Sequence, residues 1–512
     1  MWIANADRSR IVDQLAEAEF GLTSNVLMER AGCAVFDVVR EVLPRGGRIV
    51  VQCGKGHNGG DGFVVARLAK EAGYGVDCLV AATEADLKPS TREQCELARA
   101  AGVEPIFSDE PRWSRRQELI GCRDLVVDAL LGSGGEHSVT GPIRTAIEAI
   151  NRSGVPVLSV DVPSGIHCDT GEELGESIWA MRTVTIGQPK PYLFQGLGLE
   201  HAGFWTVADI GYPDELLEDP TDARLLDAAW VGNLLPERRR ASHKGENGNV
   251  LVVAGSSRMR GAAVLAAKGA LRAGAGLVTV AGVQSVLEAV AAQIPEALLF
   301  PLPERDGVIS ADAAKLLIDS QNRYFSCLFG PGMTHEEPAL EFLKKVWSEW
   351  TRPTVIDADA LNAIALGVPL PRVPCVLTPH PGEMSRLLEL SIAECQADRF
   401  HTVRHAVSKF GQCVLLKGPY SIVGDHGQPM AVNCTGNSGM ASGGMGDVLT
   451  GIIATLMAQE LPPYYAASCA MYWHGLAADH CANQIGPIGF SARDVALALP
   501  AARAKITASC ES

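Results

Sequence analysis

Short runs of apolar, mostly β-branched residues alternate with longer amphipathic stretches along the whole chain. Runs that are apolar along their length and separated by segments of helical period are typical of parallel strands covered on both faces. In the first half these runs occupy residues 48–53, 75–80, 124–128 and 155–160. In the second half they occupy residues 249–254, 276–281, 325–329, 354–357, 375–377 and 413–416. The pattern predicts an α/β protein with two doubly wound sheets.

Residues 211–236 separate the two series of runs. The segment carries three prolines and several acidic residues, a composition typical of a connection between domains. We expect one domain over residues 1–215, a linker over 216–236 and a second domain over 237–512. The chain has no internal repeat, which indicates two different folds and not a duplication.

Composition and charge narrow the class of protein. The 512 residues are 47% hydrophobic and 20% charged, which is ordinary for a globular protein and too much chain for one core. The net charge of -15 argues against nucleic acid or an anionic membrane as the main partner. The 14 cysteines lack zinc-type spacing and indicate buried thiols in a reducing compartment. No signal peptide or apolar run of about 18 residues is present, so we expect a cytoplasmic protein.

A glycine-rich loop over residues 437–446 runs into an apolar segment of helical period and sets Asp447 at the junction. The backbone N–H groups of such a loop, together with the positive end of the helix dipole, favour a phosphate. A carboxylate beside a phosphate makes sense if it accepts the proton of a hydroxyl that attacks the phosphoryl group. The loop therefore predicts phosphoryl transfer to an alcohol; the alternative is a flexible turn before a buried helix.

The first half has a glycine-rich loop of its own over residues 54–62, between a predicted strand and a helix. Asn58 and Asp61 place polar side chains where a pyrophosphate loop needs only backbone. Asp128, Asp161 and Ser164 follow later strands, and the carboxyl ends of parallel strands meet at one edge of a sheet. Several oxygen ligands around one point suit a hard cation. The alternative is that these residues cap separate helices and turns.

The second half resembles the ribokinase-like enzymes, and most closely the ADP-dependent dehydratase of hydrated NAD(P)H. The similarity rests on the glycine-rich loop, on Lys-Gly-Pro-Tyr-Ser at 417–421, on Thr-Pro-His-Pro-Gly-Glu at 378–383 and on the segment 243–256. The resemblance implies that Asp447 is the catalytic base. It implies nucleotide contacts from Lys417, Gly418, Pro419, Tyr420, Ser421 and Gly446, and substrate contacts from Ala262, Gly332, His380 and Asp447. His380, between two prolines, has the alternative role of a packed turn residue.

The first half resembles the NAD(P)H-hydrate epimerase family through segments 58–62, 128–132 and 161–165 and through the upstream segment 26–32. The resemblance implies a potassium ion on Asn58, Asp128 and Ser164. It implies that Lys190 handles protons beside Asp161, although a lysine after a strand is otherwise usually solvated. The implied contacts to the hydrated dinucleotide are His57, Asn58, Gly59, Gly60, Asp61, Gly132, Ser133, Gly134, Gly135, Glu136, His137, Ser138 and Asp161.

Together the two resemblances imply a bifunctional repair enzyme for damaged nicotinamide cofactor, a homo-oligomer that uses ADP and magnesium. Its substrates are the 6R and 6S hydrates of NADH or NADPH, in which water has added across the 5,6 double bond of the dihydropyridine ring. One half interconverts the epimers; the other phosphorylates the C6 hydroxyl and eliminates phosphate, releasing AMP. Met445 and Ser438 depart from the usual glycine-loop residues of the family.

Two alternatives stay open at the level of sequence. The second half resembles small-alcohol kinases in its glycine loop and Asp447, and the first half has the features of a binding module without catalysis. ATP also remains open as the phosphoryl donor, because both nucleotides present the same adenine and α-phosphate to Lys417–Ser421.

Overall fold

The computed structural model describes residues 1–218 and 222–508. The chain divides into two compact units, Trp2–Asp222 and Ala223–Ser512, and Met1 belongs with the second unit. Residues 219–221 of the expected linker lie outside the described residues. The later part of that linker contributes strand β9 (Ala223–Leu225) and helix α9 (Ala228–Leu234) to the second unit.

The first unit is built on a seven-stranded sheet in the order β4-β3-β2-β5-β6-β7-β8, in which all neighbours are parallel. The four strands predicted from apolar runs are β2 (Arg48–Cys53), β3 (Gly75–Val80), β5 (Leu125–Ala129) and β6 (Val157–Val160). The sheet also contains β4 (Pro105–Phe107), β7 (Arg182–Ile186) and β8 (Phe204–Ala208). The prediction of a doubly wound α/β unit is confirmed.

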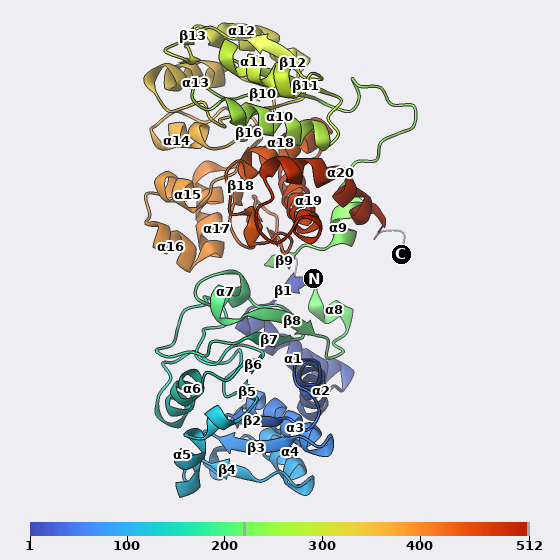
Figure 1. Ribbon diagram of the computed structural model, residues 1–512, viewed down its shortest axis with the longest axis vertical. Helices are drawn as coiled ribbons and strands as arrows, with labels where there is room; N and C mark the ends of the chain where they lie inside the picture. Colours follow the sequence, from blue (N-terminus) through green and yellow to red (C-terminus); the bar gives the residue numbers. More distant parts are fainter. Residues whose placement is uncertain (219–221, 509–512) are drawn as a thin grey trace. The chain divides into compact units, whose positions relative to one another are not determined.

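Alternation along β2 explains why both faces of this sheet are covered. Ile49 and Val51 belong to one hydrophobic cluster, with α2 (Ser24–Val42) and α3 (His57–Glu71), whereas Val50 belongs to another, with α6 (Gly141–Ser153). Figure 1 shows α5 (Pro111–Gln117) and α6 on one side of these strands and α2, α3 and α4 (Pro89–Ala100) on the other. A strand buried on both faces is largely apolar, which is the pattern in the sequence; the buried Gln52 is an exception and hydrogen-bonds Gln117.

The second unit contains the strand order β9-β20-β19-β18-β17-β16-β15-β10-β11-β12. Its six predicted strands are β10 (Asn249–Val253), β11 (Leu277–Gly282), β15 (Ser326–Phe329), β16 (Thr354–Ile356), β17 (Cys375–Leu377) and β18 (Cys413–Leu416). These six pair in parallel, and β12 (Leu298–Pro301) extends them. The antiparallel strands β19 (Ile422–Gly424) and β20 (Met430–Val432) extend the sheet beyond β18.

Helices α10 (Arg260–Arg272) and α18 (Met445–Ala458) pack against each other through glycine. A Cβ on Gly269 would lie 2.4 Å from the carbonyl oxygen of Val448, and a Cβ on Gly451 would lie 2.2 Å from that of Ala266. Only glycine allows such close approach of two backbones. This packing fixes the start of α18, where Asp447 lies. Among the described residues no helix is long and apolar enough to cross a membrane.

Gly59, in the first turn of α3, tolerates no side chain. A Cβ there would lie 1.9 Å from the carbonyl oxygen of Gly54, which directly follows β2. We expect Gly59→Ala to destabilise the first unit by about 1–3 kcal/mol, because the added methyl group forces the backbone apart. Hydrogen exchange of peptides from β2 and α3 should show lost protection. Gly121→Ala is the control, because its nearest contact would be at 3.7 Å; equal protection in both variants would contradict the expectation.

Candidate active sites

In the first unit, one edge of the sheet gathers the polar residues that follow β2, β5 and β6. Asp128, within β5, is fully buried and accepts hydrogen bonds from Ser159 Oγ at 2.8 Å and from the N–H of Ser164 at 2.9 Å. Ser164 Oγ donates to the same carboxylate at 2.5 Å. Burial raises the pKa of Asp128, and these hydrogen bonds oppose the rise. The carboxylate is thus held without a cationic side chain among the described residues.

Asn58, in the first turn of α3, reaches across to the residue before Asp161. Its Nδ2 donates to the carbonyl of Val160 at 2.8 Å, while its Oδ1 is buried and accepts no hydrogen bond within the described part of the chain. Gly132 lies against both groups, since a Cβ there would be 3.0 Å from Asn58 Nδ2 and 3.2 Å from Asp161 Oδ2. The structure therefore brings Asn58, Gly132 and Asp161 together.

Asp161 and Lys190 form a buried ion pair. Lys190 Nζ lies 2.5 Å from Asp161 Oδ1 and also donates to the carbonyl of Ile186 at 2.6 Å. The N–H groups of Ile186 and Ser133 donate to the same carboxylate at 3.1 Å each. Lys190 is only 2% exposed, so the alternative of a solvated lysine is wrong. Asp161 has a φ of 68°, in the left-handed region.

The other expected contact residues of this half differ in position. Gly59, Gly60 and Asp61 are buried in the first turns of α3, and His57 at its start is exposed. Gly132 and Ser133 lie at the Asp161 carboxylate. The remaining residues of the loop lie at the surface: Gly135 is half-buried, and the exposed ones are Gly134, Glu136, His137 and Ser138.

In the second unit, Asp447 lies in the first turn of α18, directly after the glycine-rich loop. Gly444, the residue before the helix, has a φ of 90°, which glycine adopts readily. Burial, reinforced by the nearby charge of Asp357, raises the pKa of Asp447 to about 7, although Lys417 opposes the rise. A carboxylate with such a pKa is suited to accept a proton near neutral pH.

Lys417 links Asp447 to two further acids. Its Nζ lies 2.6 Å from Asp357 Oδ1 and 3.7 Å from Glu383 Oε2, and a Cβ on Gly446 would be 3.4 Å from it. Burial lowers the pKa of Lys417, but the carboxylates of Asp357 and Glu383 outweigh this and raise it. Lys417 is therefore protonated, and its positive charge lies at the start of α18, where a phosphoryl group would develop negative charge.

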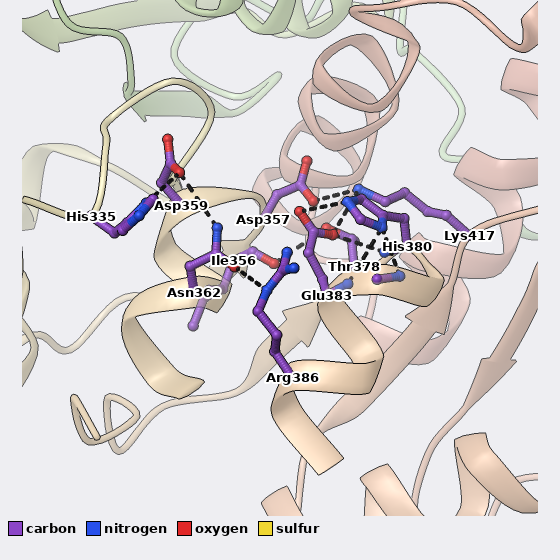
Figure 2. A network of polar contacts seen from close by, with 11 residues as sticks. His335, Ile356, Asp357, Asp359, Asn362, Thr378, His380, Glu383, Arg386 and Lys417 are labelled. Carbon is purple, nitrogen blue, oxygen red and sulfur yellow. Dashed lines mark hydrogen bonds and ion pairs between the residues drawn. The ribbon is translucent and has the colours of Figure 1, made fainter. Parts of the chain in front are cut away.

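His380 caps helix α15 (Pro381–Leu388) and borders the same cluster (Figure 2). Its Nδ1 accepts from the N–H of Gly382 at 3.0 Å, and Glu383 Oε2 accepts from the N–H of His380 at 2.8 Å. Burial and the charge of Lys417 lower the pKa of His380, so the ring is neutral at pH 7. Nδ1 is thus used in capping the helix, while the ring remains half-exposed beside Lys417.

The remaining expected residues of this half fall into two groups. A Cβ on Gly332 would lie 3.1 Å from that of Ala262, so these two expected substrate contacts are neighbours. The loop from Lys417 to Ser421 connects the antiparallel strands β18 and β19, and Ser421 Oγ donates to the carbonyl of Gly418 at 3.1 Å. The buried Arg399 donates a hydrogen bond to the carbonyl of Pro419 and so holds this loop in place.

Sequence reasoning missed Asp357 as a site residue and used Glu383 only as part of a motif. Asp357 directly follows β16, so its position at a strand end was a usable signal. The same cluster continues through Asp359, which accepts from the N–H of Thr334 at 2.8 Å and contacts Asn362, whose Oδ1 accepts from Arg386 (Figure 2). This network ties the loop after Gly332 to α15.

Comparison with known proteins identifies the family. A family model described as NAD(P)H-hydrate dehydratase matches residues 250–501, and one described as YjeF-related protein N-terminus matches residues 24–192. The bifunctional NAD(P)H-hydrate repair enzyme Nnr of Moorella thermoacetica is 38% identical over 98% of this chain and 96% of its own length. The chain belongs to the family of bifunctional NAD(P)H-hydrate repair enzymes.

Further matches agree with this family. The repair enzyme of Coxiella burnetii is 39% identical over 95% of this chain and 96% of its own length. A solved ribokinase-like superfamily protein from Enterococcus faecalis is 27% identical, with a TM-score of 0.50, and covers 56% of this chain and 96% of its own. The expected function is confirmed: this repair enzyme combines NAD(P)H-hydrate epimerase and dehydratase halves.

The raised pKa of Asp447 has a consequence for the dehydratase half of the repair enzyme. If Asp447 is the base, its proton must be absent for turnover, so kcat for dehydration should rise with pH through about 7. One pH unit below that value, kcat should be about tenfold below the plateau. The measurement is a pH profile from 6 to about 9 on the 6S hydrate at saturating nucleotide, with hydrate stability checked at each pH. A profile that is flat across neutrality would rule out this role.

Proposed function

We propose that this chain interconverts the 6R and 6S hydrates of NADH and NADPH and dehydrates the 6S hydrate with ADP, releasing AMP and phosphate. One observation carries the proposal: Asp447, with its pKa near 7, and the cationic Lys417 meet where the glycine-rich loop enters α18. A base and a phosphate-binding cation at one helix start are what phosphoryl transfer to a hydroxyl requires.

In this mechanism Asp447 accepts the proton of the C6 hydroxyl as its oxygen attacks the β-phosphoryl group of ADP. A new bond forms between the β-phosphorus and the oxygen on C6, while the bond between that phosphorus and the bridging oxygen of AMP breaks. The N–H groups of the glycine loop and Lys417 stabilise the negative charge that develops on the oxygens of the transferred phosphoryl group. Phosphate is a far better leaving group than hydroxide. Loss of phosphate from C6 and of a proton from C5 then restores the 5,6 double bond and NAD(P)H.

Lys417 to Ser421, with Gly446, would hold the nucleotide, and Ala262, Gly332 and His380 would contact the hydrated ring. Among the described residues no group of three histidine, cysteine or acidic side chains is arranged to hold a metal ion. We therefore infer that magnesium enters with the phosphates of the nucleotide, which is common for this ion. It would supply charge neutralisation of the phosphates. ADP as the donor, with ATP as the alternative, remains part of the proposal.

The oxygens of the first unit fit a potassium ion. Asn58 Oδ1 is buried and lacks a hydrogen bond within the described residues, and the Asp128 carboxylate is fully buried without a paired cation there. A cation bound by Asn58, Asp128 and Ser164 would give Asn58 Oδ1 a partner and would neutralise the charge of the Asp128 carboxylate. Potassium would thereby fix the segment 131–133 beside Asp161. Asp161 and Lys190 would handle the protons of epimerisation.

A cytoplasmic location is the remaining part of the proposal. Thirteen cysteines in the described residues are free thiols, and most are buried, which supports a reducing compartment. Association into homo-oligomers stays a prediction from the sequence.

Purified hydrates test the whole function. We expect the full chain with ADP and magnesium to restore the near-ultraviolet absorbance of NAD(P)H from both the 6R and the 6S hydrate. Asp447→Asn should lower the dehydration rate by about 100-fold or more, because the base is lost. Asp312→Asn, at an exposed position that forms no helix-capping bond, is the matched control. Recovery from the 6S hydrate alone would remove the epimerase half, and phosphorylation without dehydration would indicate a small-alcohol kinase.

Replacing potassium by choline tests the cation site. We expect epimerisation to slow, while dehydration of pure 6S hydrate stays unchanged. Potassium should also stabilise the first unit, by about 2.7 kcal/mol at a concentration 100 times the dissociation constant. That stabilisation is measured as a rise in the melting temperature on adding potassium, and Asn58→Ala should abolish the rise. A potassium-induced shift of the same size in Asn58→Ala and in the unchanged protein would place the ion elsewhere.

A further inference from the structure

Asp61 is an acid of the first unit whose environment differs from that of Asp161 at the same edge of the sheet. It lies on α3, one helical turn after Asn58, so both side chains are on the same face of the helix. The residue is only 9% exposed. Within residues 1–218 and 222–508, no side chain or N–H group donates a hydrogen bond to its carboxyl group.

Asp161 presents the opposite case in the same site. Its carboxylate accepts from Lys190 Nζ and from the N–H groups of Ser133 and Ile186. Such a set of donors and a cation stabilise the ionised form. The site thus holds one carboxyl group that accepts three hydrogen bonds and a second, Asp61, that accepts none from the described residues. Paired acids in contrasting environments commonly divide into base and acid.

The groups that face Asp61 favour its protonated form. Burial raises the pKa of Asp61 well above its usual value, the carboxylates of Asp161 and Asp13 raise it further, and Lys190 opposes them. Asp13, from helix α1 (Ala6–Phe20), accepts a hydrogen bond from the hydroxyl of Tyr212. The Tyr212 ring lies against Gly187, next to the Ile186 carbonyl that holds Lys190. Asp13 and Tyr212 both lie outside residues 24–192, the segment that the YjeF-related family model matches.

The chemistry of the hydrate calls for such an acid. Carbon C6 carries a hydroxyl group and is bonded to ring nitrogen N1, so it is a hemiaminal carbon. A hemiaminal inverts by opening: the hydroxyl proton leaves, a C6=O bond forms and the C6–N1 bond breaks. The electron pair of that bond goes to N1, which needs a proton. One base and one proton donor are therefore required, with no oxidant or reductant.

We propose that Asp61 is the proton donor to N1 in the epimerisation, while the Asp161 carboxylate, held by Lys190, accepts the hydroxyl proton. This inference rests on the epimerase activity of the first half. The open intermediate carries an aldehyde at C6 and an N–H at N1. Rotation about the C5–C6 bond presents the other face of the aldehyde to N1. The C6–N1 bond then re-forms as Asp61 takes the N1 proton back and Asp161 returns one to oxygen.

Asp61→Asn in the full-length chain tests the proposal, because asparagine keeps the size of the side chain but donates no proton. We expect kcat for epimerisation to fall about 100-fold or more in both directions, with KM within about twofold. Epimerisation is followed by chromatographic separation of the two hydrates, with potassium present and nucleotide absent. Dehydration of pure 6S hydrate by the same sample should be unchanged, which reports that the second half is intact.

Two controls separate failure of the inference from failure of the fold or of the function. Hydrogen exchange of α3 peptides must match in Asp61→Asn and the unchanged protein, and Asp86→Asn, at an exposed position of the same unit, should keep full epimerase activity. An active unchanged protein with an Asp61→Asn variant within threefold of it would overturn the role of Asp61. An inactive unchanged protein would instead overturn the epimerase function.

Solvent isotope distinguishes ring opening from loss of the C6 hydrogen. In deuterated water the proposed route leaves the hydrogen on C6, so mass spectrometry of the epimerised hydrate should find no carbon-bound deuterium at C6. Incorporation of deuterium there in step with epimerisation would overturn the ring-opening step and the need for a donor to N1.

Discussion

Each half of the chain holds a lysine against a buried aspartate at the carboxyl edge of its sheet; Lys190 is buried and Lys417 is half-buried. Lys190 lies 2.5 Å from Asp161 and Lys417 lies 2.6 Å from Asp357. Removing one partner of such a pair leaves an uncompensated charge that costs about 3–5 kcal/mol. Each site also has a second acid without a comparable partner, Asp61 in one and Asp447 in the other. Burial raises the pKa of this second acid in each site.

Close backbone packing keeps these charges in position. Helix α18 approaches α10 through Gly269 and Gly451, and this contact fixes the start of α18 beside Lys417. In the first unit the turn before α3 closes through Gly59 and presents Asn58 to Val160. Both arrangements place a helix start at the carboxyl edge of parallel strands. The two halves therefore use the same architecture for two reactions of one substrate.

The strongest apolar runs predicted the central strands of both sheets, because strands buried on two faces are apolar throughout. Strands β4 and β19 are short, and β8 at the sheet edge is largely half-exposed, so neither length nor pattern distinguished them. Motifs within one segment also predicted Asn58, Asp161 and Asp447. The pairing of Lys417 with Asp357 joins residues 60 positions apart, and Asp13 meets Tyr212 across 199 positions. Such contacts depend on the assembled sheet and leave no local signal.

The backbone of Asp161 has a conformation that is unfavourable for a residue with a side chain. With a φ of 68° it occupies a region that glycine adopts freely and that costs other residues roughly 1–2 kcal/mol. A glycine at this position would relax the backbone and remove the carboxylate together. The same change would leave Lys190 buried without its partner, at a cost of about 3–5 kcal/mol, so the ion pair outweighs the backbone strain and stabilises an aspartate at this position.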